Sequence, residues 1–121
     1  MSKLRAIIKR PDEEFGHVTN ISDTLENLQR TVGGYIETVS MTVEVNGERK
    51  RFVIVCDEEG RLKGKDYNCT VLGVLLRGDI VVLGVNEDEF ADCPLTFGEW
   101  KEILSRGTEL WRSISSRRLI G

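Results

Sequence analysis

An Asn-Gly pair at positions 46 and 47 separates two runs in which apolar and polar residues alternate. Asn-Gly is the preferred pair for a two-residue type I′ turn, because both of its residues accept positive φ. Before the pair, Tyr35 to Val45 has the period of two that is typical of a strand, and Glu48 to Val55 follows after it. The pattern therefore predicts a long antiparallel hairpin.

The turn also predicts the register of this hairpin. Counting outward from the Asn-Gly pair sets four cross-strand pairs: Val45 with Glu48, Glu44 with Arg49, Met41 with Phe52, and Val39 with Ile54. Apolar side chains then meet on one face, while Glu44 meets Arg49 on the other, as cross-strand pairing favours. Because turn chemistry and side-chain pattern agree, the hairpin is the best-specified part of the chain.

A short amphipathic helix is predicted just before the hairpin. Ser22 or Asp23 is expected to cap it, and Asp23 with Glu26 resembles a capping box. Gly33-Gly34 ends it, since glycine takes positive φ without strain. Residues at i, i+3 and i+7 predict one narrow apolar face, formed by Leu25, Leu28 and Val32.

Apolar runs elsewhere predict three further strand segments. Leu4 to Ile8 is expected to form a first strand, and His17 to Ile21 a second strand or an extended lead-in. Asp57 to Gly60 reads as a turn after the hairpin. Ile80 to Val85 is apolar at both odd and even positions, which is typical of a central strand covered on both faces.

The segment after residue 68 has two readings. Cys69 to Leu76 fits a short helix that Asn68 caps and Gly78 closes. The valines and threonine of Thr70 to Leu76 instead favour a strand. We prefer the helix, because Gly78-Asp79 separates two apolar runs that would otherwise be fused.

A last helix follows an acidic loop at Asn86 to Cys93. Thr96-Phe97-Gly98-Glu99 matches a capping box. Residues 105–121 are expected to extend this helix at the C-terminus. We expect the apolar stripe of the helix to pack in the core, and any exposed part to serve as an interface between copies of the chain. The interface candidates are Trp100, Leu104 and Trp111.

Composition narrows the class of protein. The chain has 121 residues, which fits one domain. We expect residues 1–121 to form a single α+β domain, with a mixed, mostly antiparallel sheet of about five strands and two or three helices. The net charge of −3 argues against nucleic acid as a partner. The apolar runs are too short to cross a membrane, and no signal peptide is apparent, so we expect a cytoplasmic protein. Three widely spaced cysteines and a lone His17 predict reduced thiols and neither a metal site nor a cofactor.

A basic loop carries the candidate ligand site. Arg61, Lys63, Lys65 and Asn68 precede the helix preferred above, and backbone N–H groups with nearby lysines suit a phosphate or another anion. The competing reading is a solvated loop in which Asn68 is a plain cap. The acidic runs at residues 12–14, 57–59 and 87–89 have the spacing of surface turns and read as solvated.

Four segments together resemble a known family. They are TLENLQRTVGGYIETV, CDEEGRLKGKDYN, GDIVVLGV and the helix start LTFGEWKEIL, within Leu4 to Leu104. This combination is similar to DUF3846, a family of domains of unknown function. The resemblance implies a small α+β domain that is common in phages and bacterial mobile elements and has no assigned catalytic activity. Lys65-Asp66-Tyr67 departs from the family pattern, which has a proline-containing stretch there.

These observations favour a non-enzymatic binding or regulatory protein of a phage or mobile element. In its specific form, the protein counteracts a host defence by sequestering a nucleotide signal or by binding a defence protein. One alternative is a small enzyme that acts on a phosphorylated ligand through the loop at Lys63 to Asn68. Another is an assembly subunit that forms a homo-oligomer through the last helix.

Overall fold

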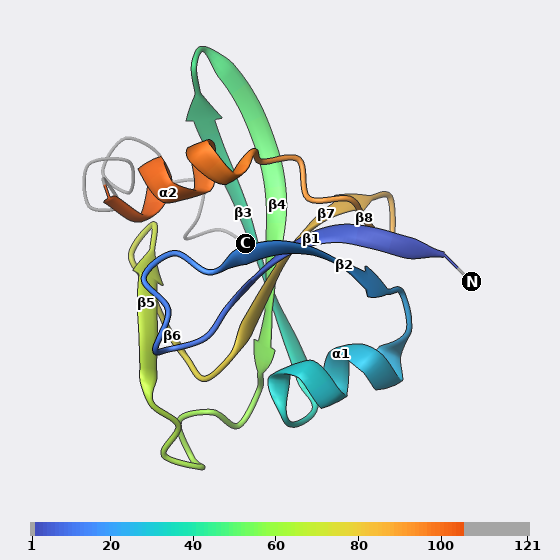
Figure 1. The fold of residues 1–121 in the computed structure, drawn as a ribbon, viewed down its shortest axis with the longest axis vertical. Coiled ribbons are helices and arrows are strands. Elements are labelled where there is room, and N and C mark those ends of the chain that lie inside the picture. The colour runs from blue at the N-terminus through green and yellow to red at the C-terminus, as the bar shows by residue number, and fades with distance from the viewer. Residues whose placement is uncertain (1, 106–121) are drawn as a thin grey trace.

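The structure is a computed structural model that describes residues 2–105. It has an α+β fold in which eight strands and two helices follow one another along this part of the chain (Figure 1). The elements are β1 (Lys3–Lys9), β2 (His17–Ser22), α1 (Leu25–Val32), β3 (Ile36–Val45), β4 (Glu48–Asp57), β5 (Tyr67–Val71), β6 (Val74–Arg77), β7 (Ile80–Asn86), β8 (Glu89–Ala91) and α2 (Phe97–Ser105). The predicted fold class is confirmed.

The main sheet is antiparallel and has six strands. Five of them follow the order β2-β1-β7-β4-β3, and β8 pairs with the far part of β7. The run at Ile80 to Val85 is therefore a central strand, as predicted. The segment expected as an acidic loop differs from the prediction, because Glu89 to Ala91 pairs with β7 and forms β8.

The long hairpin has the predicted register. Each of the four expected pairs is present between β3 and β4. Asn46 and Gly47 both have positive φ, 53° and 78°, as a type I′ turn requires. Arg49 and Glu44 also form the expected cross-strand ion pair, at 3.4 Å.

The helix predicted at Cys69 to Leu76 is wrong. This segment forms a second hairpin, β5–β6, which turns at Leu72 and Gly73 with φ of 49° and 85°. Leu72 takes the unfavourable left-handed conformation while its side chain is completely buried, so core packing offsets the local strain. The β-branched residues of the segment therefore form strands, and Asn68 lies within β5 instead of capping a helix.

The first helix begins later than expected. Because β2 continues to Ser22, the N-cap is Thr24, whose side chain accepts a hydrogen bond of 3.1 Å from the Asn27 amide. Gly33 ends the helix in the left-handed conformation, as predicted. The apolar face is narrower than predicted, since Leu25 is 58% exposed.

The capping box of α2 is confirmed. The Glu99 amide donates to the Thr96 hydroxyl at 3.0 Å, and the Thr96 amide donates to the Glu99 carboxylate at 2.9 Å. Trp100 follows in the first turn and is completely buried. Trp111 and the rest of the expected extension beyond Ser105 lie outside the described residues.

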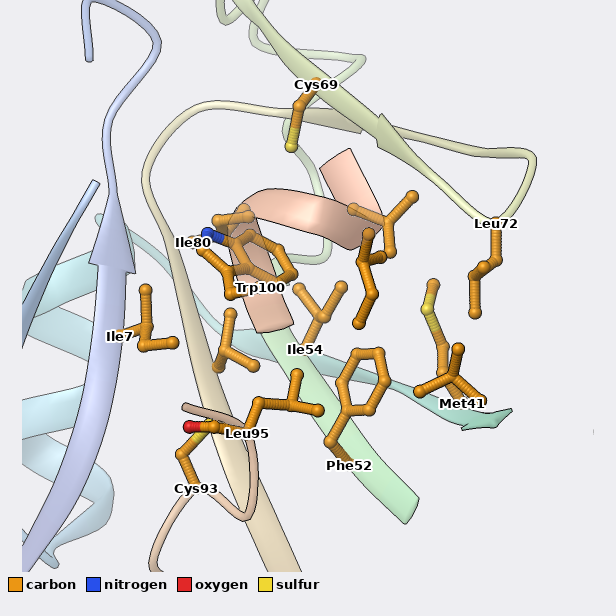
Figure 2. Close-up of a cluster of buried hydrophobic side chains, with 14 of the residues drawn as sticks. Ile7, Met41, Phe52, Ile54, Cys69, Leu72, Ile80, Cys93, Leu95 and Trp100 are labelled. Carbon is orange, nitrogen blue, oxygen red and sulfur yellow. The ribbon is translucent and has the colours of Figure 1, made fainter. Parts of the chain in front are cut away.

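Two apolar clusters lie on opposite faces of the main sheet. The central strands supply both, because neighbouring residues such as Ile54 and Val55 point to opposite sides. On one face, α2 and the β5–β6 hairpin cover a cluster that contains Trp100 and Phe52 (Figure 2). On the other face, α1 covers the second cluster. No helix in the described residues is long and apolar enough to cross a membrane.

Candidate functional site

A buried carboxylate lies where the hairpin ends. Asp57 is the last residue of β4, and its side chain is only 1% exposed. Lys63 and Lys65, from the loop that follows, each place Nζ at 2.8 Å from Asp57 Oδ2. The Glu59 amide donates to the other carboxylate oxygen at 2.9 Å. Burial by itself raises the pKa of Asp57, but the hydrogen bonds from the two lysines outweigh it and hold the pKa well below its ordinary value.

The same two lysines bind the C-terminus of α1. Lys65 donates to the Val32 carbonyl at 2.7 Å, and Lys63 donates to the Gly33 carbonyl at 3.1 Å. Cations are favoured there, because the last carbonyls of a helix lack partners and carry partial negative charge. The lysines therefore connect the helix end, the end of β4 and the loop into one unit.

The glycine pair after α1 leaves room for this unit. A Cβ atom at Gly34 would lie 2.6 Å from Asp57 Oδ1 and 2.6 Å from Lys63 Nζ. A Cβ atom at Gly33 would lie 2.8 Å from Lys65 Nζ. The close approach of the charged groups explains why two glycines stand here, beyond the positive φ of Gly33 that ends the helix.

A buried amide–lysine pair holds the β5–β6 hairpin against β1. Lys9 is 3% exposed and donates to Asn68 Oδ1 at 2.9 Å. The Asn68 amide donates in return to the carbonyls of Lys9 and Gly78, at 2.8 and 2.7 Å. Every polar atom of the Asn68 side chain is thus used within the fold.

A groove of about 710 Å³ opens beside the unit formed by Asp57, Lys63, Lys65 and the end of α1. Its walls come from the turn after β1, the C-terminal part of α1, the loop after β4 and the turn before β7. It is lined by three cationic and three anionic residues: Arg10, Arg30 and Lys65, with Asp12, Asp66 and Asp79. Arg10 and Asp79 form a loose ion pair of 3.7 Å across it.

The four residues of the predicted anion site do not form one site. Lys65 lines the groove, but both it and Lys63 already bind Asp57 and the end of α1. Asn68 is 7% exposed and holds the two strands together. Arg61 is exposed on the far side of the loop, where it lines a separate hollow of about 360 Å³.

The predicted interface residues also separate. Trp100 is completely buried and donates from its ring nitrogen to the Phe15 carbonyl at 2.8 Å, so it belongs to the core. Leu104 is partly buried against the same cluster. Trp111 lies outside the described residues.

The three cysteines are buried, and the histidine contacts a neighbouring carboxylate. Burial raises the pKa of Cys56 and of Cys69 to about 11, and it also raises the pKa of Cys93. A thiol in this state is a poor nucleophile at neutral pH. His17 Nδ1 lies within hydrogen-bond distance, 2.9 Å, of the carboxylate of Glu13, four residues before it. Among residues 2–105, no three His, Cys, Asp or Glu side chains come together as metal ligands would.

A comparison with family models shows the family of the chain. The model of a domain of unknown function, DUF3846, matches residues 4–104. The chain belongs to this family. No curated protein and no solved structure matches the chain.

Three of the segments that carry the DUF3846 resemblance meet at the groove. Gly33, which ends the helix within the first segment, accepts hydrogen bonds from lysines of the second. The Asp66 carbonyl, also in the second, accepts from the Gly78 amide at the start of the third, at 2.8 Å. The sequence shows these segments as separate, and only the tertiary fold reveals that they form a common surface.

Sequence reasoning missed the most important residues of this surface. Asp57 read as one carboxylate of a solvated acidic turn, although it follows an apolar strand directly and is therefore well placed for burial. Arg10 and Arg30 lie far from the basic loop in the chain and gave no local signal. They reach the groove only because β1 and α1 lie beside the loop in space.

Proposed function

We propose that this DUF3846 domain is a non-enzymatic binding protein and that the groove takes a small ligand that bears phosphate. The observation that carries the proposal is the placement of Arg10 and Arg30, from two different elements, on the wall of the same groove. Arg30 is exposed and, among residues 2–105, has no carboxylate partner. Arg10 forms the loose pair with Asp79, in which both side chains are more than a third exposed.

The chemistry of the groove favours a nucleotide among such ligands. A volume of about 710 Å³ lies within the range of small-molecule sites. Guanidinium groups bind phosphate oxygens with two parallel hydrogen bonds. The carboxylates of Asp12, Asp66 and Asp79 would repel a pure polyanion, but they can accept hydrogen bonds from ribose hydroxyls or from base amino groups. A ligand that combines phosphate with such donors therefore fits better than inorganic phosphate.

The two lysines have a supporting role in this proposal. Both ammonium groups already bind Asp57 and the last carbonyls of α1, so they are not free to turn toward a ligand. Lys65 shapes the groove wall and presents its aliphatic stem there. The anion site is thereby assigned to the two arginines instead of the basic loop.

Sequestration is the form of binding that we propose for a phage or mobile element. A protein that withdraws a nucleotide signal from a host defence needs affinity for that nucleotide, but it needs no activated nucleophile. The buried thiols, with their raised pKa, agree with such a role. In the second form of the proposal, the domain binds a defence protein, and the groove takes a phosphate group that this protein carries.

A ligand screen tests the proposal. Thermal shift and calorimetry would compare mononucleotides with linear and cyclic dinucleotides, with inorganic phosphate as the reference anion. We expect at least one nucleotide to raise the melting temperature more than inorganic phosphate does. Arg30→Ala and Arg10→Ala should each weaken its binding about tenfold or more, which corresponds to about 1.4 kcal/mol.

Arg61→Ala is the matched control. It also removes an exposed arginine, but Arg61 lies in the loop after β4 and does not line the groove. Its affinity for the nucleotide should equal that of the unchanged protein. If no nucleotide stabilises the protein, or if Arg61→Ala weakens binding as much as Arg30→Ala, the groove is not the site. Recovery of the ligand chemically unchanged after prolonged incubation supports binding alone, whereas its conversion would favour the enzyme alternative.

A further inference from the structure

The outer edge of β3 is a long strand edge at one end of the main sheet. β3 pairs with β4 on its inner side, and no other strand among residues 2–105 pairs with it. It is ten residues long, whereas β2 at the opposite end has six. An uncovered strand edge presents unpaired N–H and C=O groups, which can bind another strand.

The turn of the hairpin determines which backbone groups face outward. In a hairpin with a two-residue turn, Val45 and Glu48 exchange hydrogen bonds, and such pairs alternate along the strands. Val43, Met41 and Val39 therefore bond to β4, and the even-numbered residues from Ile36 to Glu44 direct N–H and C=O away from it. The Tyr35 carbonyl agrees with this alternation, because it accepts from the Glu58 amide on the inner side at 2.9 Å.

β3 has few of the devices that usually protect an edge, and its two charged residues, Glu37 and Glu44, lie near its ends. It contains no proline and no lysine, and its ten pairs with β4 run without a bulge. The middle of the outward-bonding set is uncharged and consists of Thr38, Ser40 and Thr42. Tyr35, next to the strand, is 68% exposed, and tyrosine is enriched at protein interfaces.

We propose that β3 pairs with β3 of a second copy of this chain, in antiparallel orientation about a two-fold axis at Ser40. Ser40 then faces Ser40 of the second copy, and Thr38 faces Thr42 of the second copy twice, once on each side of the axis. Cross-strand Thr–Thr pairs of this kind are favourable. The six-stranded sheets of the two copies become one continuous sheet.

Side-chain charge and side-chain direction both exclude a pairing that is shifted by one residue. In the proposed pairing, Glu37 faces Val43 of the second copy and Glu44 faces Ile36 of the second copy. A shift by one residue would set Glu37 opposite Glu44, and it would also turn the polar column of one strand to the apolar face of the other. Of these two registers, the proposed one both matches the faces and separates the carboxylates.

The mass in solution tests the proposal with two variants at one position. We expect the unchanged protein at high concentration to have twice its chain mass of 13.7 kDa by sedimentation or light scattering. Ser40→Pro removes an outward N–H and no hydrogen bond to β4, so the chain should fold but remain a monomer. Ser40→Ala keeps the N–H and should remain a dimer. Circular dichroism and thermal unfolding serve as the control that both variants are folded.

A charge exchange tests the register. Thr38→Lys combined with Thr42→Lys sets lysines opposite each other across the axis and should give a monomer. Thr38→Glu combined with Thr42→Lys sets opposite charges together and should preserve the dimer. A monomeric unchanged protein at its highest soluble concentration, a dimeric Ser40→Pro variant, or equal masses for the two double variants would each overturn the proposal.

Discussion

Replacing Asp57 with asparagine removes a buried negative charge while keeping the shape of the side chain. The amide oxygen can still accept from the Glu59 N–H, but the charge that balances Lys63 and Lys65 is lost. A hydrogen bond to a charged group contributes about 1.5–3 kcal/mol. The Lys63 side chain is 39% exposed, so solvent screens its pair with Asp57 and its share is small. The bond from the more buried Lys65 dominates, and it predicts a loss of about 2–3 kcal/mol in the free energy of unfolding at pH 7.

Urea unfolding at pH 7 measures this loss, and thermal unfolding should show a decrease of about 10 °C in melting temperature. Glu58→Gln is the control, because it removes the adjacent but exposed carboxylate and should change stability little. A loss below about 0.5 kcal/mol for Asp57→Asn, which is the level of an ordinary surface substitution, would refute the reasoning.

The pH dependence gives a second reading of the same group. The pKa of Asp57 in the folded protein lies below its ordinary value of 3.8, so the folded state holds this proton less tightly than the unfolded state. Its contribution is therefore fully present above the unfolded pKa and is lost as pH falls through 3.8 toward the folded pKa. The stability difference between the unchanged protein and Asp57→Asn should shrink over that range. A difference that stays constant from pH 7 to pH 3 would contradict the pairing with lysines.

Three further predictions concern groups around the same surface and the buried thiols. Gly34→Ala places a methyl group against the buried Asp57 carboxylate and should lower stability by about 1–3 kcal/mol, measured by urea unfolding. A neutral result would mean that the loop can move aside. Asn68→Ala removes the shortest bond of the Lys9 ammonium, which keeps two of 3.4 Å to backbone carbonyls, and also the donor to the carbonyls of Lys9 and Gly78. It should lower stability by about 2–4 kcal/mol. Retention of the original melting temperature would contradict the role of this pair. Cys56, whose pKa is raised to about 11, should react with a thiol reagent at pH 8 only as fast as the protein opens, so rapid labelling of the folded protein would show that it is accessible.

Local signals predicted the elements whose stability is decided within a few residues. The Asn46-Gly47 turn and the Thr96 to Glu99 capping box each form from groups that are close in the chain, so their geometry follows from residue type. The β5–β6 hairpin was missed for the opposite reason. Leu72 takes positive φ only because the core buries its side chain, and no local rule favours a leucine there.

The candidate site depended almost entirely on long-range contacts. A pattern in one segment can show that Lys63 and Lys65 are basic, but it cannot show that a carboxylate six residues earlier is buried between them. Arg10 and Arg30 are 20 residues apart in the chain and line one groove because of the way β1 and α1 pack. The sequence alone therefore suggested a site in the basic loop. Of its four residues, the fold places only Lys65 on the groove, together with Arg10 and Arg30.

The amino-acid sequence by itself determined the long hairpin with its register, the central strand, the glycine stop of α1 and the cap of α2. These follow from side-chain period and turn chemistry, which act over a few residues. Only the tertiary structure decided that Lys63 and Lys65 both bind the buried Asp57, that Asn68 is buried against Lys9, and that β3 lies at the edge of the sheet. Electrostatic pairing and burial depend on groups brought together from distant segments, so they become defined when the chain packs.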